Sequence, residues 1–78
     1  SPNPVRRSAR IEFSLAEAAP VTLEVVDSLG RTVATLAEGP HLAGTHLVQF
    51  DASRLASGVY FYRLRTSEAS VTRTLVRL

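Results

Sequence analysis

Residues 55–64 read LASGVYFYRL, a glycine corner followed by large side chains in alternation, and this stretch decides the fold. Side chains of a β-strand point alternately to its two faces, so Tyr60, Tyr62 and Leu64 share one face. Gly58 is predicted to mark the start of the strand, because glycine enters turn conformations at no steric cost. Two tyrosines and a leucine on one face suit the centre of a small β-structure. The segments on both sides of this stretch also read as strands.

The size and composition of the chain limit what it can do. Its 78 residues predict a single domain over residues 1–78, with a small core and little room for a buried polar site. There is no cysteine, which excludes disulfides and thiolate zinc sites. The nine cations are all arginines, scattered among seven carboxylates, and this distribution argues against a nucleic-acid partner. No apolar run is long enough to cross a membrane, so we expect a soluble chain.

Two amphipathic segments in the first third of the chain predict half-buried strands. Residues 10–15 (RIEFSL) and residues 21–27 (VTLEVVD) alternate between apolar and other side chains. Residues 16–20 (AEAAP) lie between them, are too few for a stable helix, and are predicted to form a turn. A further short edge strand is expected near Val5, because an edge tolerates the adjacent Pro4. The side chains predicted to face inward in the first segment are Ile11, Phe13 and Leu15. In the second segment, Val21, Leu23 and Val25 are predicted to share one face.

A tight turn is predicted to follow, with Asp27 at its first position and Gly30 at its last. A glycine there enters the left-handed conformation that closes a short hairpin loop. The returning strand is expected over residues 31–37, although its alternation is too mixed to assign faces. Residues 38–44 contain two glycines and a proline and are expected to form a loop.

Residues 45–51 (THLVQFD) predict another amphipathic strand, with Phe50 on its buried face. The next few residues are expected to form one helical turn. Asp51 would cap its first free N–H groups, and Leu55 would fold back onto the core.

The last two strands are predicted to form a hairpin with Ser67 and Glu68 at its tip. This register sets Tyr62 opposite Arg73. A shift by one residue would set Arg63 opposite Arg73, a like-charge pair, and is therefore disfavoured. On the second face, four apolar residues form a strip that we expect to meet a partner or, weakly, a second copy of the chain. These residues, called the apolar strip below, are Val59, Phe61, Val76 and Leu78.

Together these segments predict an all-β fold, a seven-stranded antiparallel immunoglobulin-like β-sandwich. The strands are short, turns recur every eight to twelve residues, and no segment reads as a convincing helix. An SH3-like or other small barrel is the alternative architecture.

The sequence predicts no catalytic residue, no cofactor and no metal ion. His41 and His46 are the two histidines, and no third ligand is suitably spaced. The serines in the turns are explained by their local hydrogen bonds, and no two carboxylates are spaced for shared acid–base work. Tyr60, Phe61 and Tyr62 cannot form one flat stacking platform, because neighbours on a strand point to opposite faces. At most, Tyr60 and Tyr62, which share one face, could stack on a carbohydrate.

Four motifs, in this order along the chain, resemble one protein family. They are PNP at residues 2–4, VTLEVVDSLGRTVATL at 21–36, AGTH at 43–46 and LASGVYFYRL at 55–64. Over essentially its whole length the chain resembles the type A C-terminal sorting domains of the type IX secretion system in Bacteroidetes-related bacteria. The immunoglobulin-like domain of flagellar hook-assembly scaffold proteins resembles the same motifs. The positions that match the family pattern are Pro2, Asn3, Pro4, Gly30, Arg31, Gly44, Gly58 and Tyr60.

The chain departs from that family pattern at three positions. Ser1 and Val5 stand where the family usually has an aromatic residue and a phenylalanine around the PNP motif. Phe50 stands where a tryptophan is frequent, a change that keeps the burial. These departures leave the fold prediction intact.

The resemblance implies a non-catalytic secretion signal, fused to the C-terminus of a cargo enzyme or adhesin. The implied partners are the outer-membrane translocation machinery of the type IX system and a sortase-like peptidase. The cargo would pass through the periplasm and the outer membrane, and then be released or attached to the cell surface. The alternative function is a carbohydrate-binding or adhesive immunoglobulin-like accessory module of a secreted enzyme.

Overall fold

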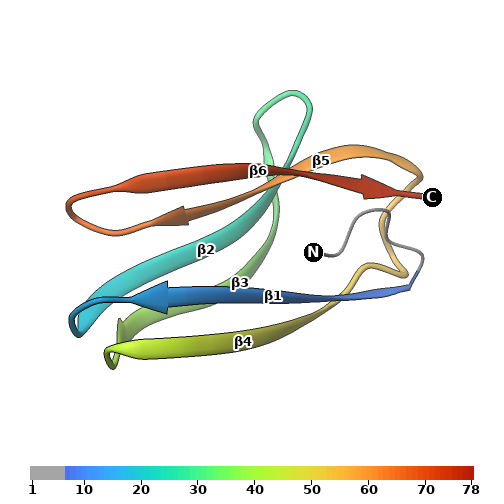
Figure 1. Ribbon diagram of the computed structural model, residues 1–78. Coiled ribbons are helices and arrows are strands. Elements are labelled where there is room, and N and C mark those ends of the chain that lie inside the picture. Colours follow the sequence, from blue (N-terminus) through green and yellow to red (C-terminus); the bar gives the residue numbers. More distant parts are fainter. Residues whose placement is uncertain (1–6) are drawn as a thin grey trace.

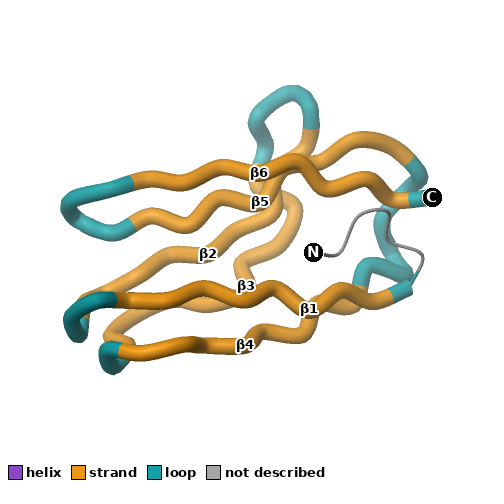
Figure 2. The backbone as a smooth tube through the Cα atoms, viewed as in Figure 1, coloured by secondary structure: helices purple, strands orange, loops and turns teal. Residues whose placement is uncertain are grey.

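A computed structural model describes residues 7–78 of the chain (Figure 1). This part contains six β-strands joined by short turns, and it contains no helix, hence none that could cross a membrane (Figure 2). The strands are β1 (Ser8–Leu15), β2 (Ala19–Asp27), β3 (Thr32–His41), β4 (Gly44–Asp51), β5 (Gly58–Arg65) and β6 (Ser70–Arg77).

All strand pairs within residues 7–78 are antiparallel, and the strands form two sheets. One sheet has four strands in the order β3-β2-β5-β6, and the other consists of β1 and β4. The all-β, antiparallel prediction is confirmed. The prediction of seven strands is not, because the described residues form six. The seventh was expected near Val5, which lies outside the described residues.

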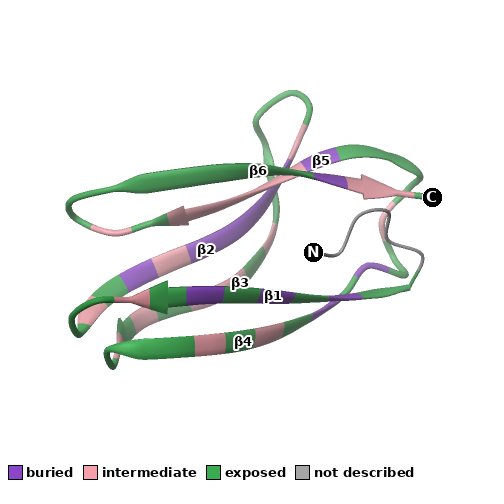
Figure 3. Cartoon of the chain, in the orientation of Figure 1, coloured by how far each residue is buried: buried purple, intermediate pink, exposed green. Residues whose placement is uncertain are grey.

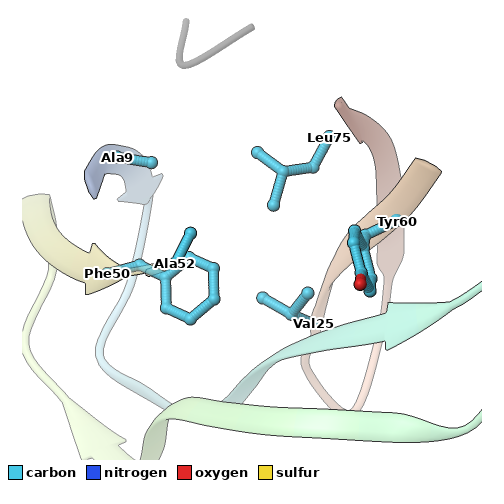
Figure 4. Packing of buried hydrophobic residues seen from close by; sticks show 6 residues of the cluster. All are labelled: Ala9, Val25, Phe50, Ala52, Tyr60 and Leu75. Carbon is cyan, nitrogen blue, oxygen red and sulfur yellow. The ribbon is translucent and has the colours of Figure 1, made fainter. Parts of the chain in front are cut away.

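The core consists of two clusters of buried side chains, and both clusters join residues of the two sheets. Figure 4 shows the first, in which Leu75 of β6 and Val25 of β2 lie opposite Phe50 of β4. The second joins β1 and β2, and the inward residues predicted for β1 lie in it or against it. Of the three residues predicted to share one face of β2, Val21 and Leu23 lie in this cluster and Val25 lies in the first. Figure 3 shows the burial concentrated along β1 and β2. The first cluster consists of Ala9, Val25, Phe50, Ala52, Tyr60 and Leu75, and the second of Ile11, Phe13, Val21 and Leu23.

Strand β3 is longer than predicted, and this corrects the expectation of a loop over residues 38–44. Gly39 pairs with Val21, and Pro40 pairs with Pro20. Pro20 therefore belongs to β2 and not to the turn predicted over residues 16–20. Prolines are tolerated here because β3 is an edge strand, and β5 pairs with β2 only from Thr22 onward. The only connection left between β3 and β4 is the pair of residues 42–43.

Two β-bulges explain why the faces of β3 could not be assigned from its sequence. The register between β2 and β3 shifts once between Leu23 and Glu24 and once between Val25 and Val26. Each shift leaves one extra residue in β3, namely Leu36 and Val33. A bulge interrupts the two-residue alternation, so a regular pattern cannot be read across it. Leu36 still packs against both core clusters.

The predicted register of the last hairpin is confirmed. Tyr62 pairs with Arg73, and the Thr66 amide donates to the Ala69 carbonyl at 2.9 Å across the tip. The turn after β4 differs from the predicted helical turn: it is a non-helical turn closed by a hydrogen bond from the Leu55 amide to the Ala52 carbonyl.

Candidate recognition surface

The apolar strip lies on the face of the four-stranded sheet that points away from β1 and β4. Val59 pairs with Val76 across the β5–β6 hairpin, and Phe61 pairs with Val26 of β2. Val59 is 49% exposed and Leu78 is 48% exposed, whereas Phe61 and Val76 are half-buried. Apolar side chains from two strands and the chain end thus lie on one face of the sheet, and two of them are about half exposed.

An ion-pair cluster borders the apolar strip on the same face. Glu24 of β2 accepts hydrogen bonds from Arg63 at 2.8 Å and from Arg65 at 2.7 Å, and Thr32 donates to its second oxygen at 3.2 Å. The Glu24 side chain is only 9% exposed, while the two arginines keep 33% and 49% of their surface in solvent. The arginine stems therefore cover the carboxylate, and the cluster carries a net positive charge next to the strip.

The hydrogen bond from Arg63 holds the pKa of Glu24 below its ordinary value, against an opposing effect of burial. Thr32 and the charges of both arginines act in the same direction as that hydrogen bond. The sequence indicates no partner for Glu24, because Arg63 and Arg65 are about forty positions away. The signal that could have found them is the pairing of β2 with β5, which sets Glu24 opposite Arg63.

The Asp27 turn matches the predicted geometry. Gly30 has φ of 84°, and its amide donates to the Asp27 carbonyl at 3.0 Å. One Asp27 carboxylate oxygen accepts from the amides of Leu29 and Arg31, and the other accepts from Arg31 Nε at 2.8 Å. The Arg31 amide is the main cause of the lowered pKa of Asp27. Two of the motif positions, Gly30 and Arg31, therefore close this hairpin.

Replacing Gly30 with alanine is expected to lower the free energy of unfolding by about 1–2 kcal/mol, the cost of a left-handed backbone for a residue with a Cβ atom. The space around Gly30 is open, so no steric contact adds to this cost. Gly30→Asn is the matched control, because asparagine tolerates the left-handed region. Urea unfolding followed by circular dichroism measures both variants. An alanine variant as stable as the parent would contradict the backbone explanation.

The other motif positions have structural roles or lie outside the described residues. Tyr60 is buried in the first core cluster, and its hydroxyl donates to the Ala56 carbonyl at 2.7 Å. Gly58 and Gly44 begin β5 and β4 with φ of 151° and 118°. Pro2, Asn3 and Pro4 lie outside the described residues. The burial of Tyr60 removes it from any sugar-stacking surface, so the two-tyrosine platform is not formed.

The two histidines lie together against Phe13. The rings of His41 and His46 have centroids 5.2 Å apart, and the His46 ring stacks on Phe13 at 5.1 Å. His41 Nδ1 lies 2.9 Å from the Gly39 carbonyl. Among residues 7–78, no group of three or more histidine, cysteine, aspartate or glutamate side chains could hold a metal ion. His41 of β3 and His46 of β4 thus pack against Phe13 of β1.

The structure brings the apolar strip together and separates it from most of the motif positions. Gly30, Arg31 and Gly44 serve turns and strand starts, and Tyr60 points to the opposite face of β5 from Val59 and Phe61.

Comparison with known proteins gives one match. A family model described as a secretion system C-terminal sorting domain matches residues 2–77. The comparisons with curated proteins and with solved structures returned no match. The matched family is the one that the four sequence motifs resemble, and its members are non-catalytic sorting signals. Because the match covers nearly the whole chain, the chain belongs to the family of C-terminal sorting domains of the type IX secretion system.

Proposed function

We propose that this domain directs a cargo protein, fused upstream of it, across the outer membrane to the cell surface or the medium. The observation that carries the proposal is the family match over residues 2–77. The domain itself performs no catalysis, and its partners are the outer-membrane translocation machinery and a sortase-like peptidase. That peptidase cleaves the domain from its cargo, which is then released or anchored at the surface.

The apolar strip is the surface through which we propose that the machinery, or weakly a second copy, recognises the domain. Val59 and Leu78 are half exposed, on a face with no third layer among the described residues. The arginines beside the strip favour a partner with an apolar centre and an acidic rim. The immunoglobulin-like sandwich is proposed as the fold that presents this face, supported by two antiparallel sheets that share both core clusters.

A reporter fusion tests the apolar strip. The domain is joined to the C-terminus of a periplasmic reporter in a bacterium that carries the type IX system, and Val59→Glu is combined with Leu78→Glu. A charge buried at an interface without a partner costs several kcal/mol, which is more than tenfold in affinity. We expect secretion of the reporter to fall by about tenfold or more, with the reporter retained in the periplasm.

The matched control is Leu29→Glu combined with Leu42→Glu, because both leucines are 77% exposed and lie outside the apolar strip. Circular dichroism of the purified domains verifies that both double variants fold. Equal secretion of the two variants would exclude the strip as the recognised surface. Failure of the unmodified domain to export the reporter would contradict the sorting function itself.

A further inference from the structure

Strand β1 presents an open edge. Within residues 7–78 it is hydrogen-bonded to β4 alone. The Ala52 amide donates to the Arg7 carbonyl at 2.7 Å, and this contact fixes which peptide groups of β1 face β4. Because these groups alternate along an antiparallel pair, the N–H and C=O groups of Arg10, Glu12 and Ser14 point away from β4. They form a row of backbone donors and acceptors along the edge.

A groove runs between this edge and the β5–β6 hairpin. Its narrow part has a volume of about 230 Å³ and includes Glu12 and Arg73 beside its apolar floor. Its wide part, about 620 Å³, lies between the β1–β2 turn and the hairpin tip. Val71 is 47% exposed at the wall that the two parts share. The apolar lining of the narrow part consists of Ile11, Phe13, Leu23, Tyr62, Leu64 and Val71.

The wide part of the groove is acidic. Among the described residues that line it, Glu17 and Glu68 are the charged ones, and neither forms an ion pair within residues 7–78. Glu12 and Arg73 balance each other in the narrow part. A ligand that fits the whole groove is therefore apolar in the middle and cationic at the end that reaches Glu17 and Glu68.

We propose that this groove binds an extended segment of another protein by strand addition to β1. The segment pairs with the peptide groups of Arg10, Glu12 and Ser14, and every second side chain of an added strand enters the groove. Those side chains are apolar, and a lysine or arginine of the segment pairs with Glu17 and Glu68. The groove opens on the face of β5 and β6 opposite to the apolar strip, so it is a site separate from that strip.

The probe is a synthetic peptide, Lys-Thr-Val-Thr-Val-Thr-Lys, capped at both ends so that a lysine reaches the acidic end in either direction. Binding to the whole domain is followed by NMR titration and by amide hydrogen exchange. We expect saturable shifts at Leu64 and Val71, and slower exchange of the Arg10, Glu12 and Ser14 amides. A peptide with glutamate in place of both lysines should bind at least tenfold more weakly.

Two pairs of variants separate the backbone and side-chain contributions. Glu12→Pro removes an outward N–H without breaking the β1–β4 ladder, whereas Glu12→Ala removes the same carboxylate and keeps the N–H. Glu12→Pro should therefore bind the peptide about tenfold or more weakly than Glu12→Ala. Val71→Asp should abolish binding, and Val71→Thr should keep most of it. Thermal unfolding of all four variants verifies that they fold.

Three results would overturn the proposal. They are the absence of saturable shifts at millimolar peptide, equal binding by Glu12→Pro and Glu12→Ala in folded protein, and shifts confined to Val59 and Val76. If the domain forms a dimer and Glu12→Pro dissociates it, the segment that binds β1 belongs to a second copy of the chain. That result would overturn the choice of another protein as the partner. The reporter assay on the apolar strip is independent of all these outcomes.

Discussion

Leu75→Ala is expected to lower the free energy of unfolding by about 2–5 kcal/mol, which is much of the stability of a domain of this size. Leu75 is fully buried in the cluster that joins β6 to β1, β2 and β4 (Figure 4). Truncating it removes contacts to both sheets and leaves a cavity that the neighbouring strands, fixed in their ladders, cannot fill. The side chain therefore ties the last strand to the rest of the fold.

Urea and thermal unfolding followed by circular dichroism measure this effect. For a domain of this size each kcal/mol shifts Tm by about 4–8 °C, so the Tm of Leu75→Ala should fall by more than about 8 °C. Leu42→Ala is the matched control, since Leu42 is 77% exposed and should change stability by less than about 0.5 kcal/mol. Equal losses in the two variants would mean that β6 is not anchored through this cluster.

Glu24→Gln is expected to lower stability by about 1–2 kcal/mol at pH 7. The carboxylate accepts hydrogen bonds from Arg63, Arg65 and Thr32, and a neutral amide cannot replace the charged acceptor for both guanidinium groups. The arginines reach solvent, so the loss stays below that of a fully buried ion pair. Glu38→Gln is the control, because Glu38 is exposed and takes no part in the ion pairs formed within residues 7–78.

The cost of Glu24→Gln should disappear in acid. The pKa of Glu24 is lower in the folded chain than its ordinary value of 4.5, so the carboxylate form stabilises the fold. That stabilisation is fully present above pH 4.5 and is lost as the pH falls through the folded pKa. Urea unfolding of parent and variant at pH 7 and at pH 3 measures the change. A difference between them that stays constant or grows in acid would contradict the ion-pair explanation.

Local alternation predicted most of the described strands, although not the full length of β3. The register of the last hairpin followed from one repulsion, because a one-residue shift would have set Arg63 against Arg73, and the observed ladder avoids that pair. The Asp27 turn was predictable because aspartate and glycine stand at the two positions where the turn chemistry requires them. These features depend on residues close together in the chain.

Features that depend on distant neighbours were not predicted. Gly39 and Pro40 suggest a loop, yet they continue β3 because an edge strand has one side without a partner to disturb. The burial of Glu24 depends on β5, which supplies both arginines. The β1 groove likewise depends on strand order, since β1 and β6 belong to different sheets and leave room between them. The apolar strip was predicted because all four of its residues belong to one hairpin and the chain end.

The pairing of β1 with β4 also determines how quickly the domain can assemble. The pair nearest in sequence, Leu15 with Gly44, closes a loop that contains all of residues 16–43. That closure costs conformational entropy before the hydrogen bonds of the ladder can form. Two strands alone are barely stable in water, so we expect this sheet to form only after the β2–β3 hairpin has brought its ends together. Chains with such non-local contacts fold in about milliseconds to seconds. During that interval the apolar side chains of the strands are exposed to solvent, and the chain is then most prone to aggregate with other chains.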